Sequence, residues 1–522
     1  MRKQAVLAIL FGVLISCASA VAQGPCSQMS GELACVIPQE YGPTANIFFG
    51  NVLLTPLGTN HPDHYNSGPQ NFSVRLTPLT KAIGRQANLL PLASPSSGVI
   101  YDPSLKTIIG DNSLGPILGE RAETVGRHRV FIGFSYQFFD FDKVDGINLG
   151  NIPVILTHSD DFQDNPVLAP QKSPCSIKSA KNINGCAFVR DLISTVNSID
   201  LKVNQYTTYV TFGLTSRIDL SVVVPVENVR LGLHSSDTII LGTNGFYPTP
   251  SSSTDILTPA PHFDHLFYNC ANPKPASASP TDTLAQATSN LDPNCLNHSF
   301  PDPAFTGGGS NPNNSASGVG DLVARVKWNA WHGERAGFAA GLDVRFPTGD
   351  ALNYLGSGSY GVKPFAIFSY RARISPHVLV GYEWNSDSIS ATDLTTNAKG
   401  SVPNDFVYSA GADALVTKWL TGSFDIIGQR SFGAETLAVT SQPFLAFCGR
   451  CTAAPSPNTV SYPNLTENSN ASYNLTNASM GIKLRPFPKV SKLVVTANVL
   501  VRLDEGGLHS KPAPLVGVGY TF

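Results

Sequence analysis

The connections between successive segments of this chain alternate between short and long, and this alternation constrains the fold more than any other feature. From about residue 114 onward, segments of alternating apolar and polar residues are joined in turn by a few residues and by a long polar stretch. The short connections lie at 125–128, 214–217, 332–335, 373–376, 417–419 and 487–490, and the long ones run roughly over 143–192, 236–317, 348–357, 387–403, 434–470 and 504–512. Membrane-spanning β-barrels have short periplasmic turns and long outer loops. The pattern therefore predicts an all-β fold, a transmembrane antiparallel up-and-down β-barrel.

The segments themselves have the period of two that is expected when one face of a strand meets lipid and the other a lumen. Between Ile218 and Glu227, for example, one face is entirely apolar and the other carries Asp219, Ser221 and Glu227. A soluble β-sandwich alternates in the same way, so the period alone leaves both folds open.

Charged residues on the polar faces are the candidates for the wall of a channel. They are Asp219, Glu227, Asp321, Arg325, Lys327, Asp343, Arg345, Lys363, Arg371, Glu383, Asp413, Asp425, Lys483 and Arg502. Both signs occur in mixed order, so no ion preference is predicted. The alternative is that these charges pair across the lumen and close it, because inward charges need partners whether or not a solute passes.

The last strand favours the barrel over the sandwich. Val516, Val518, Tyr520 and the terminal Phe522 share one face. This ending resembles the C-terminal strand that outer-membrane barrels present to their assembly machinery. We therefore expect Val518, Tyr520 and Phe522 to act as an assembly signal, with the barrel assembly machinery as a partner and outer-membrane lipid around the wall.

The number of strands is expected to be about fourteen, with twelve as the alternative. Thirteen candidates lie between about Gly115 and Phe522, and because such barrels have an even number, Gly98–Asp102 is taken as one more. Residues 23–97 fit strands poorly, and helix-like spacing runs from Leu79 to Leu90. This N-terminal segment is a possible plug or cap, and residues 98–522 form the predicted barrel, with large loops near 143–192, 236–317 and 434–470.

The first 22 residues have the order of a secretory signal peptide. Arg2 and Lys3 precede an apolar run over 5–15, and small residues follow over 18–22. A lipoprotein cleavage site ending at Cys17 is the alternative, and it also exports the chain. The predicted location is the bacterial outer membrane.

Eight cysteines follow the signal segment, and they fall into four local pairs. An even number of cysteines in an exported chain predicts disulfides, most simply within each pair. The pairs are Cys26 with Cys35, Cys175 with Cys186, Cys270 with Cys295, and Cys448 with Cys451. The last pair could instead be half of a zinc or redox site.

Composition and motifs exclude several functions. Charged residues make up 14% of the chain, with 35 basic and 37 acidic, so the chain has no positive electrostatic field that would attract nucleic acid. The sequence has no nucleophile elbow, phosphate loop or zinc-protease motif. We expect that the protein is not an enzyme and that it has no cofactor and no metal site. The His-containing motifs at 61–64 and 262–265 are interpreted as the ordinary composition of polar loops.

Four segments resemble the outer-membrane family linked to the meta-cleavage pathway of phenol degradation. They are Gly213–Val226, Gly318–Trp328, Phe346–Asp350 and Gly356–Pro364, and with the final strand the resemblance covers roughly residues 114–385. The resemblance implies a transporter-like barrel, akin to channels for long-chain fatty acids and aromatic hydrocarbons. The expected function is passive uptake of small hydrophobic or aromatic compounds. A structural or surface-interaction barrel with disulfide-stapled loops, and an outer-membrane enzyme, are the alternatives.

Overall fold

The computed structural model describes most of the barrel and part of the N-terminal segment. The described residues are 32–37, 76–86, 90–91, 114–157, 192–240, 315–391, 399–446, 458–486 and 492–522, together with the backbone of short elements at 53–54, 59–60, 72–75, 87, 101–102, 107–108, 246–248, 257–259, 265–266 and 297–300. The predicted signal peptide at 1–22 and the short connection at 487–490 lie outside them.

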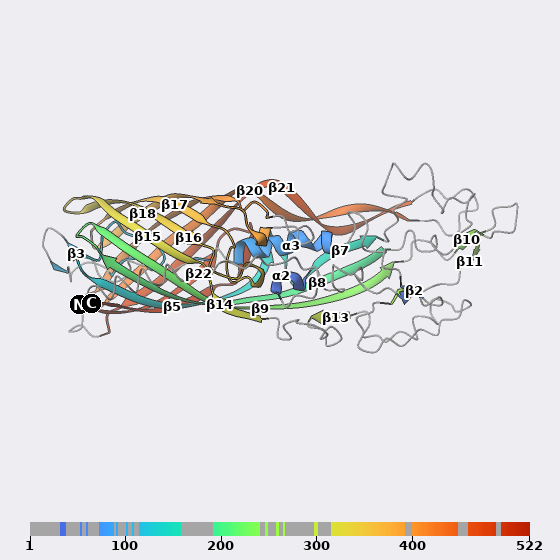
Figure 1. The fold of residues 1–522 in the computed structure, drawn as a ribbon, viewed down its shortest axis with the longest axis horizontal. Helices are drawn as coiled ribbons and strands as arrows, with labels where there is room; N and C mark the ends of the chain where they lie inside the picture. The colour runs from blue at the N-terminus through green and yellow to red at the C-terminus, as the bar shows by residue number, and fades with distance from the viewer. Residues whose placement is uncertain are drawn as a thin grey trace.

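Twelve antiparallel strands of the described chain form a closed barrel (Figure 1). In order they are β5 (Val130–Val144), β8 (Leu192–Gly213), β9 (Ile218–Ile240), β15 (Leu322–His332), β16 (Ala336–Phe346), β17 (Gly361–Tyr370), β18 (Ile374–Asn385), β19 (Asn404–Thr417), β20 (Leu420–Ala446), β21 (Asn458–Leu484), β22 (Leu493–Arg502) and β24 (Ala513–Thr521). The last strand pairs with the first, with Val518 opposite Phe134, and this pairing closes the wall. The predicted fold class is confirmed, with the alternative of twelve strands and not fourteen.

Shorter elements lengthen the wall or form separate small sheets. The wall is extended by β6 (Ile147–Asn148), β7 (Ile152–Thr157), β13 (Asn297–Phe300), β14 (Ser315–Val319) and β23 (Leu508–Ser510). The separate sheets are β1 (Leu53–Leu54) with β2 (Thr59–Asn60) and β12 (His265–Leu266), β3 (Tyr101–Asp102) with β4 (Thr107–Ile108), and β10 (Phe246–Pro248) with β11 (Leu257–Pro259). The helical elements are α2 (Leu33–Val36), α3 (Phe72–Ala87), η6 (Ala351–Asn353) and η7 (Ile389–Ala391). None of the described helices is long and apolar enough to span a membrane.

Exposure along the strands distinguishes the barrel from a soluble sandwich. On β15, Val326 is 46% exposed whereas its neighbour Lys327 is 2% exposed. On β16, Leu342 is 41% exposed whereas Asp343 is 4% exposed. Apolar side chains therefore face outward and charged ones inward, which is the arrangement of a wall surrounded by lipid.

The two strands expected before the first barrel strand are absent from the wall. The segment predicted at Gly98–Asp102 contributes only Tyr101–Asp102, which pairs with Thr107–Ile108 in a separate two-stranded sheet. The candidate beginning at Gly115 is irregular chain. Gly115 has a positive φ and Pro116 has no backbone N–H, so this stretch cannot continue a central strand.

The connection expected over 434–470 is largely strand. β20 runs to Ala446 and β21 begins at Asn458, and the two pair with each other far beyond the start of β19 at Asn404. Figure 1 shows β20 and β21 extending past the shorter strands, as do β8 and β9. The segment is polar but contains five threonines, which favour strands, and its polarity hid that preference.

Candidate functional site

Residues 114–125, here called the strap, pass through the lumen close to the short turns. Leu114 and Val125 are buried at its two ends. The backbone N–H of Leu114 donates to Thr421 Oγ1 at 2.9 Å, and the N–H of Val125 donates to Asp219 Oδ2 at 3.1 Å. Polar side chains of the inner wall therefore replace the sheet hydrogen bonds that this irregular chain lacks.

Charged pairs hold the middle of the strap. Glu120 Oε1 lies 2.9 Å from Lys327 Nζ, and Glu120 Oε2 lies 3.0 Å from Arg325 Nη1. Arg121 Nη2 lies 2.5 Å from Asp413 Oδ2. Buried charges are tolerated only with partners, and here the charged side chains of the strap and those of the inner wall are each other's partners.

A second cluster surrounds His377, which is fully buried below the strap. Its Nε2 lies 2.6 Å from Asp425 Oδ1, and its Nδ1 lies 3.5 Å from Asp413 Oδ1. Lys483 Nζ donates to the carbonyl oxygens of Leu114, at 3.4 Å, and Pro116. The short-turn end of the lumen is thus closed by a continuous polar network.

Helix α3 closes the lumen at a second level, farther from the short turns (Figure 1). Its residues Leu76, Leu79 and Ile83 are completely buried in one apolar cluster with Leu352 and Tyr354. The helix contacts β20, β21, β23 and η7, and Figure 1 shows it at the level where β20 and β21 leave the shorter strands. This closure rests on apolar burial more than on charge.

Polar contacts orient the C-terminal end of α3. Gln86 Nε2 donates to Tyr473 Oη at 2.8 Å, and Gln86 Oε1 accepts from the backbone N–H of Leu508. Arg85 Nη2 lies 2.8 Å from Glu435 Oε2. These contacts tie the helix to β20, β21 and β23.

The connection after β16 folds inward and supports this closure. Asp321 accepts hydrogen bonds from the backbone N–H groups of Gly349, at 3.1 Å, and Ser357, at 2.7 Å, and from Ser357 Oγ at 2.5 Å. Asn353 Oδ1 accepts from the backbone N–H of Leu33 in α2 at 3.1 Å. The segments Gly318–Trp328 and Phe346–Asp350, both of which carry the family resemblance, therefore position a loop inside the barrel.

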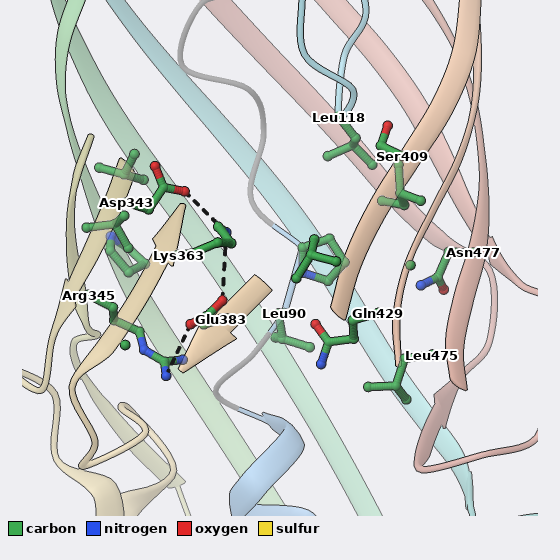
Figure 2. A pocket seen from close by; sticks show the side chains of 18 of the residues that line it. Leu90, Leu118, Asp343, Arg345, Lys363, Glu383, Ser409, Gln429, Leu475 and Asn477 are labelled. Atoms are coloured by element: carbon green, nitrogen blue, oxygen red, sulfur yellow. Dashed lines mark ion pairs between the residues drawn. The ribbon is translucent and has the colours of Figure 1, made fainter. Parts of the chain in front are cut away.

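A cavity of about 280 Å³ lies in the lumen, lined both by the strap and by the region around the end of α3. Figure 2 shows Leu90 and Leu118 beside it, from the α3 side and from the strap. The strap and α3 therefore close the lumen at two levels around an internal space.

The cavity has two chemically different walls (Figure 2). On the β16–β18 side, Lys363 Nζ lies 3.2 Å from Asp343 Oδ2 and 3.8 Å from Glu383 Oε2, and Arg345 Nη2 lies 3.4 Å from Glu383 Oε1. The β19–β21 side presents uncharged residues, namely Ser409, Gln429, Leu475 and Asn477. A guest would therefore meet an ionic wall on one side and a wall of amide, hydroxyl and apolar groups on the other.

The fourteen residues predicted for the lumen divide between the cavity and the strap. The cavity is lined by Glu227, Asp321, Arg325, Asp343, Arg345, Lys363, Glu383 and Arg502. Asp219, Lys327, Arg371, Asp413, Asp425 and Lys483 lie around the strap and His377. Their role toward a solute remains a prediction.

Sequence reasoning missed the strap charges and His377. The strand candidate that begins at about Gly115 would place Glu120, Arg121 and Glu123 in the wall, and His377 directly follows the predicted short connection at 373–376. Three charges within four residues of a Gly- and Pro-containing stretch are the signal that could have indicated a buried strap.

The remaining predicted sites are described only in part. Val518 and Phe522 are exposed on the outer face. Cys35 is disulfide-bonded, and the other seven predicted disulfide cysteines, like the side chains of the two His-containing motifs, lie outside the described residues. Within the described residues, no group of three or more His, Cys, Asp and Glu side chains is arranged to hold a metal ion.

Fold and site together define a transmembrane β-barrel whose lumen is occluded at two levels around a small cavity of mixed polarity. Residues 296–436 match the family described as "Putative MetA-pathway of phenol degradation", which confirms the resemblance stated above. Three of the quoted segments lie within that range, whereas Gly213–Val226 and the final strand lie outside it.

Comparison with solved structures matches several outer-membrane barrels. A channel from Pseudomonas putida F1 matches with 11% identity and a TM-score of 0.39, over 77% of this chain and 99% of that one. The toluene transporter TbuX of Ralstonia pickettii matches with 10% identity and a TM-score of 0.23, over 76% and 90%. A FadL homologue of Pseudomonas aeruginosa matches with 8% identity and a TM-score of 0.24, over 77% and 90%. No curated protein matches the chain.

Proposed function

We propose that the protein is an outer-membrane channel for passive uptake of small hydrophobic or aromatic compounds. The cavity between the strap and α3 is the observation that carries this proposal. Protein interiors are packed with few voids, and each void costs contacts on its lining. A barrel with a purely structural role would be more stable with this space filled by side chains, whereas a channel needs it.

Passage requires both closures to move, because the strap and α3 occupy the lumen on either side of the cavity. Ion pairs and hydrogen bonds hold the strap, and an apolar cluster holds α3. A solute can shift such an equilibrium only by binding the open arrangement better than the closed one. Uptake is therefore expected to be slow and to depend on the solute.

The proposed setting follows from the wall and the chain ends. The exposed apolar face suits outer-membrane lipid, and an aromatic terminal residue at Phe522 suits recognition by the barrel assembly machinery, together with Val518 and Tyr520. Export through residues 1–22 belongs to the same proposal. No nucleic-acid partner, cofactor or catalytic step is assigned.

Single-channel conductance of the purified protein in planar bilayers tests the function, with and without aromatic or fatty-acid solutes in the bath. We expect brief openings whose frequency changes with these solutes. A folded, heat-modifiable barrel that neither conducts nor transfers such solutes into proteoliposomes would contradict the proposal. That result would favour the alternative, a structural or surface-interaction barrel, which the occluded lumen and the disulfide at Cys35 also suit.

A further inference from the structure

We infer that the short-turn end of the barrel binds anionic phospholipid headgroups, through a ring of exposed cations that the turns present to the surrounding leaflet. Each of the six short connections has an exposed Arg or Lys in it or directly beside it. These residues, here called the rim cations, are Arg127, Arg217, Arg335, Arg373, Lys418 and Lys492. The inference concerns the wall and its lipid, and it does not depend on which solute the lumen takes.

Backbone hydrogen bonds hold the turns in a continuous rim. The carbonyl oxygen of Arg217 accepts from the N–H of Asn329 at 2.8 Å, and that of Arg373 accepts from the N–H of Leu415 at 3.0 Å. The carbonyl oxygen of Lys492 likewise accepts from the next strand. Because each turn is tied to the neighbouring hairpin at its own level, the rim cations lie in a ring around one end of the barrel.

The rim cations have no acidic partners in the described part of the chain. None of the six forms an ion pair or a side-chain hydrogen bond with another described residue. The exposed acidic groups described at this end are Glu334 and the terminal carboxylate of Phe522. Like charges on one rim repel each other and destabilise the compact state, so this arrangement suits an anionic partner that compensates them.

Outward-facing lysines near the long loops are arranged differently. Lys143 Nζ lies 3.0 Å from Glu505 Oε1, and Lys511 Nζ lies 2.8 Å from Asp140 Oδ2. Acids of the same wall therefore neutralise the lysines at that end. The near balance of charge over the whole chain thus conceals an excess of exposed positive charge at the short turns.

The position of the ring favours lipid as the partner. Trp331 and Trp419 are 53% and 48% exposed, and they lie beside the turns that carry Arg335 and Lys418. Exposed tryptophans of membrane proteins prefer the boundary between the hydrocarbon and the headgroups, so the neighbouring cations lie at headgroup level. A ring around the perimeter meets many separate headgroups, whereas a folded acidic protein would need a compact patch.

The attraction is electrostatic and therefore depends on salt. One Lys or Arg near an anionic membrane surface adds roughly fivefold to its binding. At 1 M salt the screening length falls to about 3 Å, which removes most of the attraction between exposed charges. Anionic lipid should accordingly replace neutral lipid around the short turns at low salt and not at high salt.

Quenching of tryptophan fluorescence by brominated lipids tests the inference. The full-length protein is reconstituted into phosphatidylcholine vesicles that contain brominated phosphatidylglycerol or, for comparison, brominated phosphatidylcholine. Trp328, Trp331 and Trp419 lie near the short turns, and Trp384→Phe removes the remaining tryptophan, at the other end of β18. In this parent protein we expect a preference for phosphatidylglycerol of at least about fivefold at low salt, largely lost at 1 M salt.

Two variants of the parent protein remove the same charge at opposite ends of the barrel. The rim variant is Arg217→Gln, Arg335→Gln, Arg373→Gln and Lys418→Gln. The control variant is Lys143→Gln, Lys202→Gln, Arg230→Gln and Lys511→Gln, at outward positions near the long loops. The rim variant should lose the preference for phosphatidylglycerol, and the control should keep it.

The outcomes separate lipid from other partners. Equal quenching by both brominated lipids in the parent protein overturns the inference, and so does a preference that survives in the rim variant. If the rim variant gives no heat-modifiable barrel, Arg217→Gln with Arg373→Gln replaces it, and an unchanged preference there also overturns the inference. Absence of a lipid preference, with rim-dependent binding of a labelled polyglutamate peptide in micelles, would identify an acidic protein segment as the partner instead. Failure of the proposed uptake is separate, since conductance and solute transfer measure it.

Discussion

Lys327→Met is expected to release the strap. Lys327 is 2% exposed, and its ammonium donates to Glu120 Oε1 at 2.9 Å and to the carbonyl oxygens of Arg121, at 3.2 Å, and Glu123, at 2.7 Å. Methionine has a similar length but no donor, so the change removes all three hydrogen bonds without opening a large cavity. Because Glu120 and both carbonyls belong to the strap, the loss falls on the closed arrangement of the lumen.

The magnitude follows from the burial of the pair. Breaking a buried ion pair costs about 3–5 kcal/mol, because one charge is left without its partner. Glu120 retains Arg325, so the lower end of that range, about 3 kcal/mol, applies here. A shift of that size raises the ratio of open to closed lumen by roughly two orders of magnitude.

Single-channel recording measures this ratio directly as open probability. The control is Lys143→Met, which removes a lysine from a partly exposed pair with Glu505, at the end of β5 that is remote from the strap. Exposed pairs contribute little, so the control should behave as the wild type. The reasoning is refuted if Lys327→Met yields a heat-modifiable barrel whose open probability equals that of the control.

Three further predictions concern the other closure, the inward loop and one turn. Burial and a hydrogen bond to Glu435 raise the pKa of Glu467, whereas burial of Glu435 is outweighed by Arg85, the hydrogen bond to Glu467 and Lys81 together, so that the pKa of Glu435 is lowered. Because the pKa of Glu467 is raised when α3 is docked, docking is favoured at low pH, and this stabilisation is lost as the pH rises through that pKa. Glu467→Gln should therefore make the protease resistance of α3 independent of pH above about 4.5, unlike that of the wild type, and equal pH profiles would contradict this. Asp321→Ala removes three hydrogen bonds that hold the inward loop and should lower the unfolding temperature, with Asp321→Asn intermediate; equal temperatures for both variants and wild type would contradict it. Gly213→Ala places a Cβ against the carbonyl oxygen of Gly126, so the yield of folded barrel should drop, whereas Gly422→Ala, which meets nothing within 4 Å, should fold normally.

The wall was predictable because its signals are local. Strand period, turn length and the apolar outer face recur in each hairpin. Lipid offers no hydrogen-bond partner to backbone groups, so each strand must pair with its neighbours. The charges on the inner faces could be placed for the same reason, since side chains alternate strictly along a strand. Glu227 and Lys363 were identified in this way although nothing near them in sequence indicates a cavity.

The helical spacing over Leu79–Leu90 indicated a helix, but the positions of the strap and of α3 in the lumen were not predictable, because they depend on contacts between distant parts of the chain. Glu120 meets Lys327, and Gln86 meets Leu508, across more than 200 and more than 400 residues respectively. A polar stretch with Gly115 and Pro116 has no period from which burial could be read. The strand count was too high for the same reason, since this stretch was counted as wall.

The two closures differ in chemistry, and in the proposed uptake this difference would decide which of them limits transfer. Entry past α3 requires separation of an apolar cluster around Leu79 and Ile83, and a hydrophobic solute can partly replace those contacts with its own surface. Exit past the strap requires separation of Glu120 from Lys327 and Arg325, for which an uncharged solute offers no substitute. The strap is therefore the higher barrier, so variants at Lys327 should change the rate of transfer more than variants that weaken α3.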